Sequence, residues 1–284
     1  MKKSLIAFIT VFLLLSMCSC AKTDSDDNDK KIIAVSIVPQ ATFVEAVCGE
    51  NFEILTLIPT GASPETYELT TNEMKKLSKA DIYFSIGVPA EESSILPVIN
   101  EKTKVIALHE TVRQSYPDLT EDGGRDPHIW LSPKRVKIMV NKIADELCTI
   151  DSENRSLYIE NAEKYIDNID DADRQVKVLL DGKEGYSFIT FHPSFGYFAD
   201  EYQLTQYALE EHGKEATAKR LIEMADLARQ KGIKVIFYQA EASSRQAKAF
   251  AEEIGGKAIS LEPLSADYIG NLNRMAKALS DAVK

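Results

Sequence analysis

The chain has few of the residues that build zinc fingers, redox centres or nucleotide-binding loops. Its 284 residues include four cysteines, four histidines and one tryptophan. Cys48 and Cys148 are too far apart for a Cys-x-x-Cys site, and both lie on helix-like stretches, where we expect buried thiols. A Gly-rich phosphate loop and a Gly-x-Ser-x-Gly nucleophile turn are also missing from the sequence. These absences exclude a zinc finger or a paired-cysteine redox motif.

The chain also has fewer basic than acidic residues. The formal net charge is −11. An acidic chain argues against nucleic acid as a partner and favours a cationic or neutral ligand.

The N-terminus has the organisation of an export signal. A basic start precedes the apolar run Leu5 to Leu15, which is too short to span a bilayer. Cys20 follows the small residue Ser19, as in a bacterial lipoprotein box. We therefore expect a signal peptide at 1–19, a lipid on Cys20 and an acidic flexible tether at 20–31. An ordinary cleaved signal is the alternative. In both cases the mature protein would be extracytoplasmic. In the first case, the lipid on Cys20 would anchor it to a membrane.

The rest of the chain alternates short apolar runs with helical segments, which predicts α/β structure with parallel sheets. The expected strands fall into two sets: 32–37, 52–58, 81–86 and 104–108, then 186–191, 204–209, 234–238 and 257–261. Between the sets, residues 154–180 contain neither Gly nor Pro and repeat apolar residues at helical spacing. We expect two lobes, 32–153 and 183–284, joined by one long rigid helix of about 40 Å within 154–182.

Two histidines occupy similar positions beside prolines. His128 lies in the run Asp-Pro-His-Ile-Trp at 126–130, and His192 precedes Pro193 directly after an expected strand. Either histidine alone could cap a helix or fill a polar gap. Because neutral imidazole binds metals best when the backbone orients it, the pair favours a metal site.

Two carboxylates also follow expected strands. Glu65 lies in the loop after the second strand, and Glu262 follows the last strand. Ligands of open parallel sheets bind beyond the carboxyl ends of the strands, so Glu65, His128, His192 and Glu262 would converge on one cleft. Two imidazoles and two carboxylates suit zinc, manganese or ferrous iron. We expect zinc, because it outbinds manganese at most such sites.

The chain resembles the solute-binding lipoproteins of zinc and manganese ABC importers, known as cluster A-I metal-binding proteins. The resemblance extends from Ile32 to the C-terminus, and its motifs include Gly-Ala-Ser-Pro at 61–64, 126–130, His-Pro-Ser-Phe-Gly-Tyr-Phe at 192–198 and Glu-Pro-Leu at 262–264. It implies a two-lobed fold with a rigid linking helix. It also implies a monomer that holds a metal between its lobes and delivers it to a permease, with His128 and His192 as ligands.

The sequence departs from that family in three places. The family usually has His where this chain has Glu65 and Asp where it has Glu262, and its zinc-specific members often carry a His-rich insert before His128. Glu65 is therefore either a substituted ligand or replaced by Glu68, Gln239 or water. His109 and His212 are minor candidates.

Two other classes of protein compete with this interpretation. A metal-dependent hydrolase would need an open coordination position and a separate general base, and nothing in the sequence marks a substrate pocket. A surface adhesin with a structural metal is the other. We therefore expect that the protein is not an enzyme.

Overall fold

The computed structural model describes residues 30–121, 123–210, 216–239 and 244–282. Lys31–Lys284 forms one compact unit. The expected signal peptide, the expected lipid site at Cys20 and the candidate His212 lie outside the described residues. Within the described ranges, no helix has both the length and the apolar character needed to cross a membrane.

The first lobe is built on a four-stranded parallel sheet with the strand order β2-β1-β3-β4. The strands are β1 (Ile32–Val35), β2 (Glu53–Thr56), β3 (Ile82–Ser85) and β4 (Lys104–Ala107). The helical elements are α2 (Val38–Cys48), α3 (Thr71–Leu77), the π-helical turn η1 (Glu91–Ile95), the 3-10 turn η2 (Leu96–Val98) and α4 (Leu108–Arg113). The central strands β1 and β3 are almost fully buried, which accounts for their continuous apolar sequences.

The second lobe repeats this topology. Its parallel sheet has the strand order β10-β9-β7-β8, so its first strand again lies between the second and the third. The strands are β7 (Ser187–Thr190), β8 (Thr205–Ala208), β9 (Val235–Gln239) and β10 (Lys257–Leu261). The helices are α7 (Gly196–Glu201), α8 (Ala218–Lys231), α9 (Ser244–Glu253) and α10 (Tyr268–Ala282). Both sets of expected strands are confirmed.

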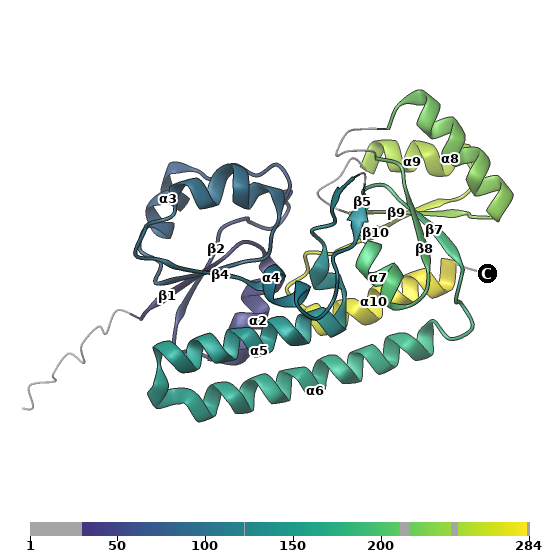
Figure 1. Cartoon of the computed structure of the whole chain (residues 1–284). Coiled ribbons are helices and arrows are strands. Elements are labelled where there is room, and N and C mark those ends of the chain that lie inside the picture. The colour runs from purple at the N-terminus through teal and green to yellow at the C-terminus, as the bar shows by residue number, and fades with distance from the viewer. Residues whose placement is uncertain (1–29, 122, 211–215, 240–243, 283–284) are drawn as a thin grey trace, which may run out of the picture. The chain divides into compact units, whose positions relative to one another are not determined.

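A helical segment connects the two sheets. It consists of the 3-10 turn η3 (Ile129–Leu131), α5 (Pro133–Ile150), the turn η4 (Ser152–Asn154) and α6 (Arg155–Leu179). Helix α6 packs against α5 along its length. It also packs against α2 of the first lobe and α10 of the second (Figure 1). Its buried residues recur at helical spacing: Tyr158, Ala162, Ile169, Ala172 and Val176. The expected linking helix is therefore confirmed.

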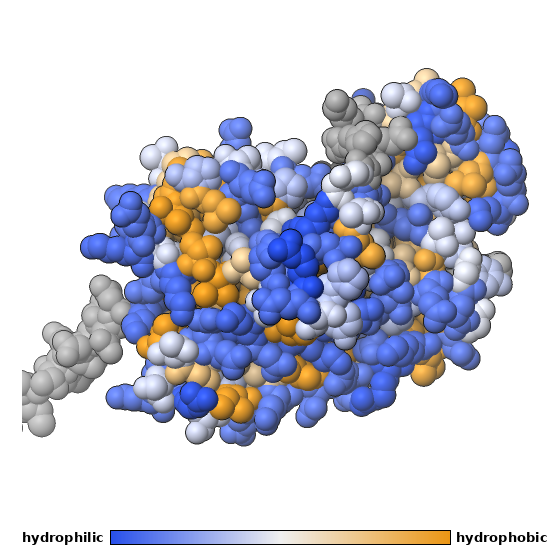
Figure 2. Space-filling view, viewed as in Figure 1, coloured by the Kyte–Doolittle hydropathy of each residue, from blue (hydrophilic) through white to orange (hydrophobic). Residues whose placement is uncertain are grey.

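Side chains alternate between the two faces of the second sheet. Phe188 and Phe237 contribute to the large core shared with α5, α6 and the first lobe. Their neighbours Ile189 and Ile236 face the opposite way, into a smaller core beneath α8 and α9. The two-residue period of a strand produces this division. The visible outer surface of α5 and α6 is mostly hydrophilic (Figure 2), as expected of helices that bury one stripe.

Two features were not expected from the sequence. One is the short antiparallel hairpin of β5 (Thr120–Glu121) and β6 (Gly124–Arg125), which lies directly before the His128 turn. The other is the π-helical turn η1. Cys48 and Cys148 are both buried, and neither forms a disulfide in the described part of the chain.

Candidate metal centre

Three segments far apart in the sequence deliver the candidate ligands. Glu65 lies in the loop after β2, where its backbone N–H donates to Ser63 Oγ at 3.3 Å. His128 is the residue before η3, and His192 follows β7. Two of these positions lie beyond the carboxyl ends of parallel strands, the usual place for ligands in such sheets.

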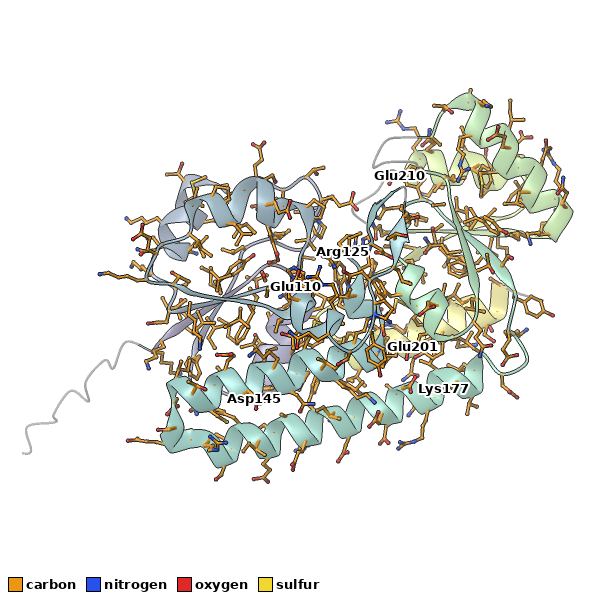
Figure 3. The ribbon with its side chains drawn as sticks, viewed as in Figure 1. Glu110, Arg125, Asp145, Lys177, Glu201 and Glu210 are labelled. Carbon is orange, nitrogen blue, oxygen red and sulfur yellow. The ribbon has the colours of Figure 1, made fainter. Side chains whose placement is uncertain are left out.

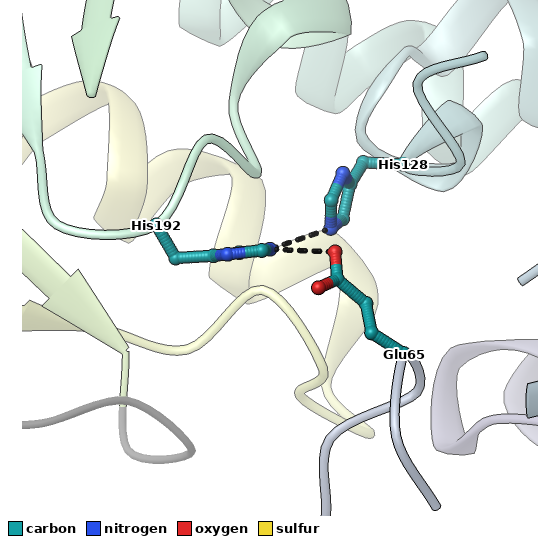
Figure 4. Close-up of side chains that lie close together, drawn as sticks. All are labelled: Glu65, His128 and His192. Carbon is teal, nitrogen blue, oxygen red and sulfur yellow. Dashed lines mark hydrogen bonds and ion pairs between the residues drawn. The ribbon is translucent and has the colours of Figure 1, made fainter. Parts of the chain in front are cut away.

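The three side chains point toward one another (Figure 4). His192 Nε2 lies 3.0 Å from Glu65 Oε1 and 3.4 Å from His128 Nε2. One ligand atom from each residue lies within 4.8 Å of the other two. The side chains of His128 and His192 are only 7% and 8% exposed. Two imidazole nitrogens and one carboxylate oxygen thus converge in a mostly buried position, as a transition-metal site requires.

A carboxylate in the same turn orients His128. Asp126 Oδ1 lies 2.8 Å from His128 Nδ1 and accepts the His128 backbone N–H at 2.9 Å. With Nδ1 engaged, the ring presents Nε2 to the site. Gly196 is required here, because a Cβ at that position would lie 2.5 Å from Asp126 Oδ2. Trp130 fixes the same turn by donating its indole N–H to Pro263 O at 2.9 Å.

A different carboxylate contacts the second histidine. Glu210 Oε2 lies 2.7 Å from His192 Nδ1. Glu210 comes from the segment after β8 in the second lobe and is labelled in Figure 3. Each histidine therefore has a carboxylate on Nδ1 and its Nε2 directed to the shared centre.

The charges around His192 shift its titration. Burial by itself lowers the pKa of His192, but hydrogen bonds to Glu210 and Glu65 outweigh burial and raise the pKa to about 9. Burial likewise acts to raise the pKa of Glu65, but the hydrogen bond to His192 and the charges of both histidines lower that pKa below its usual value. These opposite shifts favour an ionised Glu65 carboxylate beside a positively charged His192.

Not every expected ligand joins this group. Glu262 follows β10 and its side chain is exposed, while its carbonyl accepts Asn271 Nδ2 at 2.6 Å. Glu68 is exposed, and Gln239 ends β9 half-buried. Among the described residues, the three-residue group includes neither Glu262 nor Glu68.

His109 lies in α4 and is not one of the three grouped residues. Its Nε2 lies 3.6 Å from Glu110 Oε1. Burial and the nearby Arg125 guanidinium lower the pKa of His109. Among the described residues, His109 therefore lies outside the group of three candidate ligands.

Sequence reasoning missed the two supporting carboxylates. Asp126 had a local signal, because it precedes His128 by two residues in a Pro-containing turn. Glu210 had none, since only the pairing of β7 with β8 brings it beside His192.

Comparison with solved structures defines the class of protein. A crystal structure of ZnuA is 32% identical, with a TM-score of 0.83 over 89% of this chain and 99% of that one. The laminin binding protein (Lmb) of Streptococcus agalactiae has the same fold at 21% identity, with a TM-score of 0.80 over 89% of this chain and 99% of that one. With the ligand group described above, this fold defines a two-lobed metal-binding solute-binding protein, not an enzyme.

The family follows from the sequence comparison. Residues 33–282 match the family described as zinc-uptake complex component A, periplasmic (ZnuA), and the chain belongs to this family. The high-affinity zinc uptake system protein ZnuA of Bacillus subtilis is 28% identical over 96% of this chain and 94% of its own length. The expected resemblance to metal-importer binding proteins is confirmed.

Proposed function

We propose that the protein is an extracytoplasmic lipoprotein that captures a divalent transition metal, zinc in first place, and delivers it to the permease of an ABC importer. The observation that carries this proposal is the convergence of Glu65, His128 and His192 on one point between the two lobes. Manganese and ferrous iron are the alternative cargoes, because both accept mixed nitrogen and oxygen donors.

The donor set supports zinc without excluding harder metals. Two imidazoles favour zinc, and the carboxylate of Glu65 replaces the softer imidazole usual at that position in the resembling importers. The replacement moves the preference toward manganese, while the general order of metal affinities favours zinc. Zinc is therefore the expected cargo, with weaker discrimination against manganese.

The fourth coordination position belongs to Glu262 in this proposal. Its loop is held beside the His128 turn, because Trp130 donates to the adjacent Pro263 carbonyl. Glu262 therefore lies in a loop that contacts the turn of a candidate ligand. Glu68, Gln239 or a water molecule are the alternative donors.

Delivery requires a protein that stays folded when the metal leaves. Several contacts between the two lobes do not involve the candidate ligands. Ser132 Oγ donates to Glu201 Oε2 at 2.5 Å, and Tyr197 OH accepts the Leu119 backbone N–H at 3.0 Å. The Arg135 guanidinium lies 4.5 Å from the centre of the Tyr197 ring. These contacts support a site that is held ready without metal.

Elemental analysis and competitive zinc and manganese titration test the proposal. The purified protein should bind one zinc reversibly and keep its circular-dichroism spectrum after chelation. Loss of the spectrum on chelation would indicate a structural metal, as in an adhesin, and would overturn the transport assignment.

Two substitutions at Glu65 sharpen the same titration. Glu65→Ala should lower zinc affinity by about tenfold or more, whereas Glu65→His should raise the ratio of zinc to manganese affinity. Glu53→Ala, which removes an exposed carboxylate at the start of β2, is the matched control and should leave both affinities unchanged. Equal affinities for wild type and Glu65→Ala would remove Glu65 from the ligand set.

The anchor and the lobe boundaries complete the proposal. Cys20 would carry the lipid, so Cys20→Ser should move the protein from the membrane fraction to the soluble fraction. The lobes would comprise 32–153 and 183–284, with 154–182 as the linking segment. Helix α6 supports this division, because it packs against α2 of the first lobe and α10 of the second.

A further inference from the structure

Glu210 lies in the segment after the second strand of its lobe, as Glu65 does in the first lobe. Both follow the second strand of a sheet, and the two sheets have the same strand order. Glu65 reaches the centre with its carboxylate. Glu210 instead contacts the far side of a histidine ring. The two carboxylates that follow the second strands therefore have different relations to the metal centre.

The contact of Glu210 leaves one nitrogen of His192 for the metal. Glu210 Oε2 lies 2.7 Å from Nδ1, while Nε2 faces Glu65 at 3.0 Å and His128 at 3.4 Å. A histidine that donates its Nδ1–H to a carboxylate is held in the tautomer and direction that offer Nε2 as ligand. Glu210 is not itself one of the three grouped residues.

Strand pairing holds Glu210 in place. The Glu210 backbone N–H donates to Phe191 O at 2.9 Å, and that of Leu209 donates to Thr190 O at 3.0 Å. These bonds continue the β7–β8 ladder to the residue directly before His192. The side chain of Glu210 is only 15% exposed. The backbone thus aligns the carboxylate with the ring.

We propose that Glu210 is the positioning residue of His192, which fixes Nε2 as the metal-binding nitrogen and so prepares the second lobe's half of the site. The inference rests on the proposed function, because it presupposes that His192 binds the metal. Asp126 holds His128 from within one turn, whereas Glu210 acts from a neighbouring strand.

Zinc affinity measured against a competing chelator tests this role in wild type, Glu210→Ala and Glu210→Gln. Glu210→Ala should lower affinity by about tenfold to a hundredfold. Glu210→Gln should stay within about fivefold of wild type, because its amide oxygen can accept the same Nδ1–H bond. Glu53→Gln, which removes an exposed carboxylate at the start of β2, is the matched charge control and should bind as wild type does.

The nuclear magnetic resonance signal of the His192 ring separates positioning from a general charge effect. In the zinc-loaded protein, labelled with ¹⁵N, we expect a protected Nδ1–H in wild type and Glu210→Gln. We expect its protection to be lost in Glu210→Ala. Because this signal is read in Glu210→Gln as well, the test stands even where Glu210→Ala fails to fold.

Three outcomes would overturn the inference. One is zinc affinity of a folded Glu210→Ala within about twofold of wild type. Another is a Glu210→Gln variant that binds as weakly as Glu210→Ala while its Nδ1–H remains protected. The third is tight binding by Glu210→Gln without a protected Nδ1–H. Failure of the wild-type protein to bind zinc would instead overturn the proposed function.

Discussion

The two lobes have the same sheet topology but use their strand ends differently. In the second lobe, the end of the first strand provides His192. In the first lobe the corresponding residue is the buried Ile37, and Ser36 beside it, which follows β1 directly, is fully buried. Its hydroxyl contacts Tyr83 OH at 2.6 Å and also donates to Glu91. The same fold position therefore serves ligation in one lobe and internal structure in the other.

Glu91 is the centre of the first lobe's structural network. Its carboxylate accepts the backbone N–H groups of Ile86 and Gly87, each at 2.8 Å. Burial raises the pKa of Glu91, although these hydrogen bonds oppose the rise. The Gly87 carbonyl in turn accepts a hydrogen bond from Arg125, two residues before Pro127. At the end of its first strand, the first lobe thus has an internal polar network, whereas the second lobe has the candidate ligand His192.

Replacing the ligand of the second lobe should have the largest effect. His192→Ala should lower zinc affinity by more than about a hundredfold, because loss of a ligand exceeds the loss caused by removing its supporting partner. Zinc competition titration gives the affinity, and circular dichroism should show that the fold persists. Unchanged affinity would remove His192 from the site and with it the contrast between the lobes.

Replacing the network residue of the first lobe should change stability rather than binding. Glu91→Ala leaves the buried backbone N–H of Ile86 and the half-buried one of Gly87 without an acceptor, so the free energy of unfolding should fall by about 3 kcal/mol. Zinc affinity of the folded variant should stay within about threefold of wild type. Urea denaturation measures the first quantity, and exposed Glu92 on the same turn provides the control Glu92→Ala. A large loss of affinity without a loss of stability would contradict the division of roles.

The smallest expected effect is the change with pH in the stability that His192 gives to the metal-free protein. The pKa of His192 is raised from 6.5 to about 9 in the folded state. A raised pKa means that the stabilisation is complete below pH 6.5 and is lost as pH rises through about 9. The stability difference between wild type and His192→Gln should therefore shrink by about 2 kcal/mol between about pH 6 and pH 10. Urea denaturation at both pH values measures it, and a constant difference would contradict the ion pairs with Glu65 and Glu210.

Much of the fold was predictable because its signals are local. Short apolar runs marked all eight strands of the two sheets, and the Gly- and Pro-free stretch at 154–180 marked α6. The hairpin at Thr120–Arg125 was not predictable, because its four strand residues carry no apolar alternation. The π-helical turn at Glu91 also carries no local signal, and the carboxylate of its first residue contacts Ser36, which is far away in the chain.

The candidate site was predictable in part. Each of Glu65, His128 and His192 was identifiable from its place near a strand end or a Pro-containing turn. The structure brings these three together. Glu262 was expected with them from the same reasoning, but a strand-end position does not set the direction of an exposed side chain. Its role as fourth ligand remains a prediction.

By itself the sequence determined the alternation of strands and helices, the long linking helix and the two histidines stiffened by neighbouring prolines. Those properties depend on side chains within a few residues of one another. Only the tertiary structure decided that Glu65 meets both histidines and that Glu210 stands behind His192. Such contacts join segments far apart in the chain, and the order in which the parallel strands pair, which no local pattern encodes, determines which segments meet.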